Sequence, residues 1–186
     1  IAINESGNIT NNARTIWSTS TEADGPEVKE GGVAEMLRKK TNRTLYSDLG
    51  GDDALVDFTL ANAITSFGTA ALLAVDMGID ALQLQSQFDW ASGLDVDDDN
   101  DDGDVTDIRE DVFGDPLHSK PLVVNYGGAA NNQDVRIIVG TNAGFIHMFD
   151  DAGETVDESW AFIPKELFEN IELLRENSST EAKVYG

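Results

Sequence analysis

The stretch PLVVNYGGAANNQDVRIIVGTNAGFIHMFDDAGETVDESWAFI, residues 121–163, decides the fold class of this chain. Four segments in it have the composition of short strands, because β-branched and aromatic residues alternate with turn-forming Gly, Asn and Asp. They are residues 121–125, 135–140, 145–149 and 159–163. Strands that recur at a spacing of about ten residues are typical of a β-propeller blade or a β-sandwich. We therefore expect a mainly β fold with minor helices.

Three short helices are expected around this β region. Residues 32–40 place apolar side chains on one face and end with three basic residues, which suit a helix C-terminus. In residues 80–91, Asp80 is a suitable N-cap and two apolar side chains stack four residues apart. Pro164 opens the third helix, whose apolar residues form one stripe. The apolar positions are Val33, Met36 and Leu37 in the first helix, Leu84 and Phe88 in the second, and Leu167, Phe168, Ile171 and Leu174 in the third.

The charge, the cysteine content and the length of the apolar runs exclude several classes of structure and function. The net charge is −23, from 35 acidic and 12 basic residues, and such a surface repels the phosphates of nucleic acids. The absence of cysteine excludes disulfides, thiolate metal sites and cysteine nucleophiles. No apolar run approaches the ~20 residues that a membrane span needs. Ten of the acidic residues lie between Asp95 and Asp111, against the single basic Arg109. This concentration favours a local cation site over the alternative, a generally acidic surface of the kind that salt-adapted proteins carry.

This acidic segment, residues 93–111, carries the strongest functional motif. So many like charges cannot occupy a regular element without a counter-ion, so we expect a loop. Calcium loops of the EF-hand type place oxygen ligands at alternate positions and a glycine at position six, where the backbone turns sharply. Gly103 fits position six, which gives the remaining positions a definite register. Asp98, Asn100 and Asp102 then take positions one, three and five, Asp104 offers its backbone carbonyl at position seven, and Thr106 takes position nine.

The motif departs from an EF-hand at position twelve. A bidentate Glu stands there in an EF-hand, whereas this chain has Arg109, which cannot bind a cation. The ligand set must then be completed by Asp107, Glu110, Asp111 or a residue distant in sequence. A solvated acidic linker is the alternative interpretation, and Mg²⁺ fits less well because it tolerates a flexible, many-oxygen loop poorly. The register could also be shifted by the intervening acidic residues Asp95, Asp97, Asp99 and Asp101.

The two histidines do not indicate catalysis. His147 lies inside an expected strand and His118 in an expected turn, and neither has a second ligand at metal-binding spacing. Ser119 adjoins His118, but neighbouring residues seldom reach base-to-nucleophile geometry, and no Gly-x-Ser-x-Gly elbow is present. We expect a protein that is not an enzyme.

Several motifs resemble signatures of the PilC/PilY family of type IV pilus tip proteins. FGDPLHSKPLVVNYG, residues 113–127, resembles the family's R…GD-x-x-HS-x-P stretch, with Arg109 at the arginine position. Residues 136–150 and 158–164 resemble the pattern VGxNDGxLHxF…E-x-WAFIP that follows it. Upstream, DWASGLD at residues 89–95 looks like the family's WIRG-x-D, with serine in place of arginine.

The resemblance extends over roughly residues 17–164 and implies a secreted bacterial protein of the cell surface, pilus tip or outer membrane. It implies a modified β-propeller, of which one or two blades fit here, with a projecting calcium loop tied to pilus extension, retraction and adhesion. Pilin subunits and a host or abiotic surface are the implied partners. On this mapping the Ca²⁺ ligands are Asp98, Asn100, Asp102, Asp104, Thr106 and Asp107.

The expected organisation has three parts. Residues 1–92 form an irregular and partly helical lead-in, 93–111 the calcium-binding loop, and 112–186 the blade region with its C-terminal helix. Two alternatives to the pilus function stay open. One is a fragment of a quinoprotein dehydrogenase-like propeller, whose blade texture resembles residues 149–154 and Trp160. The other is a structural domain in which calcium only stiffens a loop.

Overall fold

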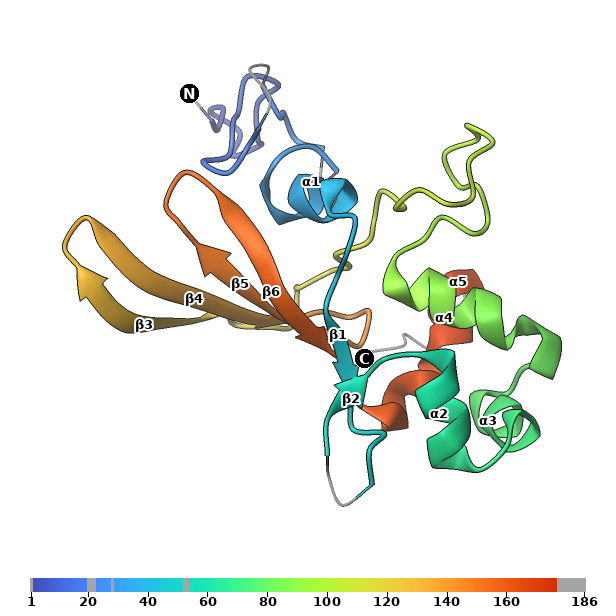
Figure 1. The fold of residues 1–186 in the computed structure, drawn as a ribbon. Helices are drawn as coiled ribbons and strands as arrows, with labels where there is room; N and C mark the ends of the chain where they lie inside the picture. The colour runs from blue at the N-terminus through green and yellow to red at the C-terminus, as the bar shows by residue number, and fades with distance from the viewer. Residues whose placement is uncertain (1, 20–22, 28, 52–53, 177–186) are drawn as a thin grey trace.

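The computed structural model describes residues 2–19, 23–27, 29–51 and 54–176 of the chain. Within these ranges a six-stranded mixed sheet has the strand order β2-β1-β6-β5-β4-β3. The sheet does not close into a barrel, because β2 and β3 lie at its two opposite edges. Figure 1 shows β3 to β6 extending to one side, while α2 to α5 gather at the end of the sheet near β1 and β2. Residues 177–186 of the expected blade region lie outside the described residues.

Four strands form an antiparallel meander, and they confirm the four strands expected from the sequence. They are β3 (Leu122–Ala129), β4 (Asn132–Gly140), β5 (Ile146–Asp151) and β6 (Val156–Phe162). In the register, His147 lies opposite Val139 on one side and Ala161 on the other. This places His147 in the middle of the sheet, where neighbouring strands cover its backbone.

Two very short strands extend the meander beyond β6. β1 (Leu45–Ser47) pairs with β6 in parallel, and β2 (Val56–Asp57) pairs with β1 antiparallel. The sequence did not predict them, because two or three residues are too few to display an alternating pattern. The parallel pair Leu45↔Ala161 makes the sheet mixed and joins the first third of the chain to its last strand.

The expected helices are present, with adjusted bounds. α1 spans Gly32–Lys39. A 3₁₀ turn, Ala81–Gln83, carries the capping box of Asp80 and leads into α4 (Leu84–Ser92). After Pro164 the chain forms a 3₁₀ helix, Lys165–Asn170, before α5 (Ile171–Glu176).

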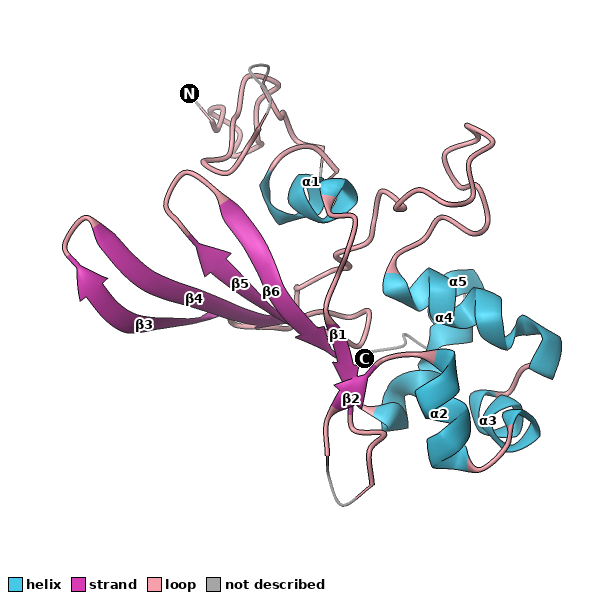
Figure 2. Ribbon diagram, in the orientation of Figure 1, coloured by secondary structure: helices cyan, strands magenta, loops and turns pink. Residues whose placement is uncertain are grey.

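Two further helices correct the expectation that helices are minor. α2 (Leu60–Phe67) and α3 (Ala70–Met77) begin after Thr59 and Thr69, whose hydroxyls accept hydrogen bonds from the backbone N–H three residues later. The sequence pattern did not predict α3 because its apolar residues surround the helix without forming one clear face. The fold is therefore a mixed helix and strand structure (Figure 2).

The main core lies among the helices at the β1 end of the sheet. Phe58, Phe88 and Phe168 form its centre, with ring centroids 4.7 Å apart for Phe58–Phe88 and 5.4 Å apart for Phe58–Phe168. Leu73 and Ala161 are fully buried against them. This core takes residues from both sides of the acidic segment, so it fixes the two ends of that segment relative to each other.

Among the described residues, no single helix has the length and apolar composition of a membrane span. Within the same described residues, α2 and α3 have that length and apolar composition when they are taken together, and the two helices meet at a bend of 95°.

Candidate metal centre in the acidic loop

The acidic segment forms the expected loop, and its two ends are joined at a neck. Gly93 ends α4 with φ at 113°, a left-handed conformation that glycine adopts without strain. Leu94 and Ile108 then form an isolated antiparallel bridge. The N–H of Asp95 donates to the carbonyl of Asp107 at 3.0 Å, and the N–H of Arg109 donates to the carbonyl of Gly93 at 3.0 Å. The loop therefore leaves and re-enters the fold at one point.

Inside the loop, the residues of the proposed register share one local pattern. Side-chain oxygens accept hydrogen bonds from backbone N–H groups further along the loop, which curls the chain as Asx turns do. Gly103, at position six, has φ at 84° and so makes the sharp turn that the register requires. The bonds run from Gly103 N to Asp98 Oδ1 (3.0 Å), Asp102 N to Asn100 Oδ1 (2.9 Å), Asp104 N to Asp102 Oδ1 (2.8 Å) and Thr106 N to Asp104 Oδ1 (2.9 Å).

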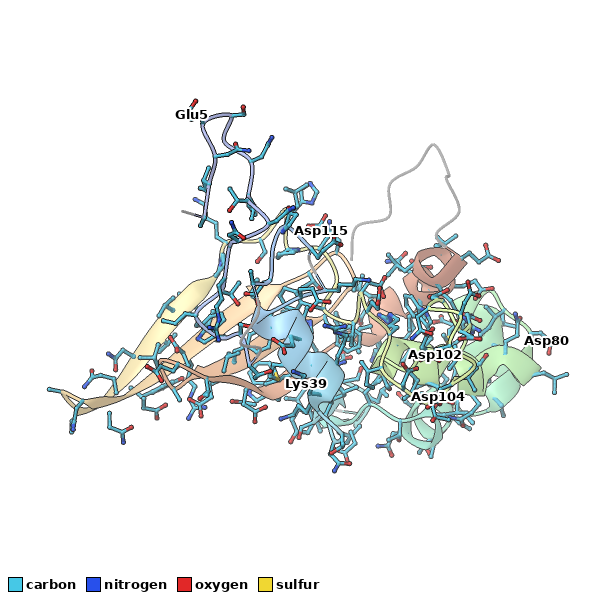
Figure 3. All side chains as sticks on the ribbon, turned by 90° about the horizontal axis from the view of Figure 1, so that it is seen from above. Glu5, Lys39, Asp80, Asp102, Asp104 and Asp115 are labelled. Atoms are coloured by element: carbon cyan, nitrogen blue, oxygen red, sulfur yellow. The ribbon has the colours of Figure 1, made fainter. Side chains whose placement is uncertain are left out.

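The structure brings three of the six predicted ligands together. The Nδ2 group of Asn100 donates to Asp102 Oδ2 at 3.2 Å and to Asp107 Oδ2 at 3.3 Å, so an amide lies between two carboxylates. Asp98 is half-buried and accepts the N–H of Gly103, whereas Asp104 is exposed and engaged in its own turn. Figure 3 shows Asp102 and Asp104 on the helical side of the molecule. Across the described residues, no three His, Asp or Glu side chains converge closely enough to hold a metal.

The neck contains two buried carboxylate oxygens that the ligand register did not include. Asp95 is only 1% exposed; its Oδ1 accepts the N–H of Asp99 at 3.0 Å, and its Oδ2 has no hydrogen-bond partner in the described part of the chain. Oδ1 of Asp107 is likewise buried and without such a partner. The sequence signal was present, since Asp95 directly follows the apolar Leu94 just after α4. The burial itself depends on the bridge to Ile108, which sequence spacing does not reveal.

Like charges accumulate around these two residues. Burial raises the pKa of Asp107, and the nearby carboxylates of Asp102, Asp95 and Asp104 raise it further. Burial also raises the pKa of Asp99, with Asp95 as the strongest charged contributor. An uncompensated group of this kind favours the uptake of a positive charge, as a proton or a cation.

The basic residues near the loop serve as anchors at its edges. Arg109 is 4% exposed; its Nη1 donates to the carbonyl of Trp90 at 2.7 Å, its Nε donates to Asp111 Oδ1 at 2.8 Å, and its guanidinium lies 3.9 Å from the centre of the Trp90 ring. Arg175 of α5 makes two 2.6 Å hydrogen bonds to Asp97. Arg109, the residue at position twelve of the motif, therefore connects the end of the loop to α4.

The histidines lie outside this centre. His147 is 1% exposed, and its Nδ1 lies 2.8 Å from Glu158 Oε1. Arg43 donates to both carboxylate oxygens of Glu158, each at 2.8 Å. Burial acts to raise the pKa of Glu158, but the hydrogen bonds from Arg43 and His147 outweigh it and hold the pKa at about 2. Burial lowers the pKa of His147 despite the adjacent carboxylate. The arrangement joins β5, β6 and the segment before β1.

His118 and Ser119 lie in the turn before β3. Nδ1 of His118 is 3.3 Å from Asn142 Oδ1, and the hydroxyl of Ser119 accepts the N–H of Gly140 at 3.1 Å. These contacts hold the turn of residues 113–121 against the end of β4, in keeping with a structural role.

Comparison with known proteins gave no relationship: no family model, curated protein or solved structure matches the chain.

Proposed function

We propose that this chain is the calcium-binding module of a secreted, non-enzymatic protein of the PilC/PilY type, which acts at the tip of type IV pili. The observation that carries the proposal is the acidic loop. There Asn100, Asp102 and Asp104 form successive Asx turns, and the side chain of Asp98 accepts the N–H of the left-handed Gly103. Alternating oxygen donors about such a glycine are the arrangement that Ca²⁺ loops use. The loop supplies hard oxygen ligands and contains no histidine or cysteine, which favours Ca²⁺ over transition metals.

Repulsion among the carboxylates of the loop determines what a bound cation would do to it. Two unit charges ~7 Å apart repel each other by about 0.6 kcal/mol even in bulk water, and the loop contains many such pairs. Ca²⁺ cancels two charges and draws its oxygen ligands to about 2.4 Å. Binding should therefore bring the carboxylate of Asp98 and the backbone carbonyl of Asp104 towards the group formed by Asn100, Asp102 and Asp107. We expect Ca²⁺ to order residues 95–107 and to steady the adjacent turn of residues 113–121.

The pilus assignment rests on the sequence resemblance and is supported by the β3–β6 meander. Four antiparallel strands are the unit of one propeller blade. Leu122, Val123 and Tyr126 on edge strand β3 are exposed, which fits a strand that the rest of a propeller would cover. In that setting the loop would regulate pilus extension, retraction and surface adhesion, with pilin subunits and a host or abiotic surface as partners.

Limited proteolysis of the chain with and without Ca²⁺, read at residues 95–107, tests the proposal. We expect Ca²⁺ to slow cleavage in the wild type and to have no effect in Asp98→Ala or Asp102→Ala. Asp76→Ala, an exposed change of the same charge in α3, is the matched control and should retain the protection. Equal cleavage with and without Ca²⁺ in the wild type would remove the basis for a regulatory ion. In the full-length protein, the two loop variants should alter pilus display or attachment without loss of secretion.

A further inference from the structure

Within the described residues, the strongest unexplained feature is the pair of buried, unpartnered carboxylate oxygens at the neck of the acidic loop. They are Oδ2 of Asp95 and Oδ1 of Asp107. A buried carboxylate oxygen that has no donor is costly, because it has lost its water and gained nothing in return. The two residues are joined directly, since the N–H of Asp95 donates to the carbonyl of Asp107. The neck of the loop therefore carries the desolvation cost of two carboxylate oxygens.

Among the residues that the structure describes, the basic side chains beside the loop donate no hydrogen bond to either of these oxygens, although the charge of Arg109 attracts Asp95 through space. Arg109 lies at the neck, but its Nη1 binds the carbonyl of Trp90 and its Nε binds Asp111. Arg175 is bound through both Nε and Nη2 to Asp97. The charges that face Asp107 through space are the carboxylates of Asp102, Asp95 and Asp104. The hydrogen bonds of both arginines therefore go to other groups, and the two buried oxygens are left among carboxylates without a donor from the described residues.

We infer that Asp95 is a ligand of the calcium ion and that, with Asp107, it supplies the oxygens that the missing position-twelve glutamate would give; this inference rests on the proposed calcium function. Ca²⁺ takes six to eight oxygens, and the alternate loop positions provide at most five. Asp107 already adjoins that set through Asn100. Asp95 is one turn away from Asp98, because the N–H of Asp98 donates to the carbonyl of Asp95 at 3.1 Å.

Adding Asp95 and Asp107 to the ligands changes which part of the protein the ion stabilises. A site confined to residues 98–106 would stiffen only an exposed loop. A site that includes Asp95 and Asp107 closes the neck, beside the bridge between Leu94 and Ile108 and next to the anchor of Arg109 on α4. Calcium would then stabilise the folded domain as well as the loop.

The test compares the calcium affinity of Asp95→Asn with that of Asp101→Asn by calorimetry. Both variants remove one charge from the same loop. The amide oxygen introduced by Asp95→Asn can still accept the N–H of Asp99, and asparagine tolerates the left-handed φ of 58° found at Asp101. We expect Asp95→Asn to weaken Ca²⁺ binding at least about tenfold and Asp101→Asn by less than about threefold, since only the former removes a ligand oxygen.

Thermal unfolding provides a second readout. Without Ca²⁺, Asp95→Asn should unfold at the wild-type temperature or above it, because an unpartnered buried charge has been removed. The rise in unfolding temperature that Ca²⁺ produces in the wild type should shrink. Asp95→Ser, whose shorter side chain cannot reach an ion, should likewise reduce the rise that Ca²⁺ produces if the asparagine variant does not fold.

The outcomes separate the two proposals. If the wild type binds Ca²⁺ and Asp95→Asn binds it as tightly as Asp101→Asn, Asp95 is not a ligand, while the calcium function stands. If the wild type binds no Ca²⁺, both proposals are overturned.

Discussion

Replacing Glu158 by glutamine should destabilise the protein by an amount that depends on pH in a specific way. Glu158 is 2% exposed and accepts hydrogen bonds from Arg43 and from His147. Its pKa is held at about 2, against 4.5 for the unperturbed group. Because a factor of ten in acid dissociation corresponds to 1.36 kcal/mol, the ionised carboxylate contributes about 3 kcal/mol to folding. Arg43 also donates to the carbonyl of Ser92 at 3.1 Å. Arg43 therefore connects Glu158 on β6 to the last residue before the acidic loop.

The sign of the pH dependence follows from the lowered pKa. A carboxyl group whose pKa is depressed by folding stabilises the protein above its unfolded pKa, and that stability is lost as the pH falls through the folded value. The contribution of Glu158 is therefore full above about pH 4.5 and disappears towards pH 2. Glutamine resembles the protonated acid, so Glu158→Gln should cost about 3 kcal/mol at pH 7 and progressively less between pH 4.5 and pH 2.

Urea unfolding of both proteins at a series of pH values, from neutral down to the folded pKa of Glu158, measures this difference directly. Asp157→Asn is the matched control, because Asp157 lies next to Glu158 and also forms an ion pair, at 2.6 Å with Lys40, but its side chain is 64% exposed. An exposed pair contributes about 1 kcal/mol or less, so the control should change stability little at any pH. A Glu158→Gln penalty below about 1 kcal/mol, or one that stays constant down to that folded pKa, would refute the reasoning.

Three further predictions concern the neck, the core and the absence of catalysis. Gly93→Ala should destabilise the protein by at least about 1 kcal/mol more than Gly78→Ala in chemical denaturation, because a Cβ at Gly93 would lie 2.7 Å from Val112 Cγ2, whereas Gly78 has positive φ but open space around it. Phe168→Ala should cost about 3–5 kcal/mol and lower the thermal midpoint, because the ring is fully buried against three other phenylalanines. A quinone cofactor should neither bind nor support dye-linked oxidation of alcohols or sugars; binding that depends on Trp160 or His147 would favour a dehydrogenase-like propeller instead.

Local sequence patterns predicted the parts of the fold that depend on local chemistry. The meander from β3 to β6 has alternating or β-branched runs with clear turns, and Asp80 and Pro164 mark helix starts in the sequence as they do in the structure. β1 was not predictable in this way, because its parallel partner β6 lies far away along the chain, with Leu45 opposite Ala161. The number of helices was underestimated because the helical segment of residues 60–77 is largely apolar and its threonine caps are weak signals.

The candidate site likewise has one part that local sequence patterns predict and another part that they do not. The Asx turns of Asn100, Asp102 and Asp104, and the bond from Gly103 to Asp98, follow from a motif in which each residue acts on a near neighbour. The burial of Asp95 depends on a contact between two ends of a long loop, and no spacing rule contains that information. Arg109, which the motif marked as a defect at position twelve, proved to be the residue that anchors the loop to α4.

Calcium titration of the wild-type chain by isothermal calorimetry, with magnesium as the control, tests the central claim most directly. The account predicts one Ca²⁺ site with a Kd of ~10⁻⁴–10⁻³ M or somewhat tighter, as in extracellular calcium modules, and weaker binding of Mg²⁺. The absence of binding heat and of bound metal at several millimolar Ca²⁺ would contradict it.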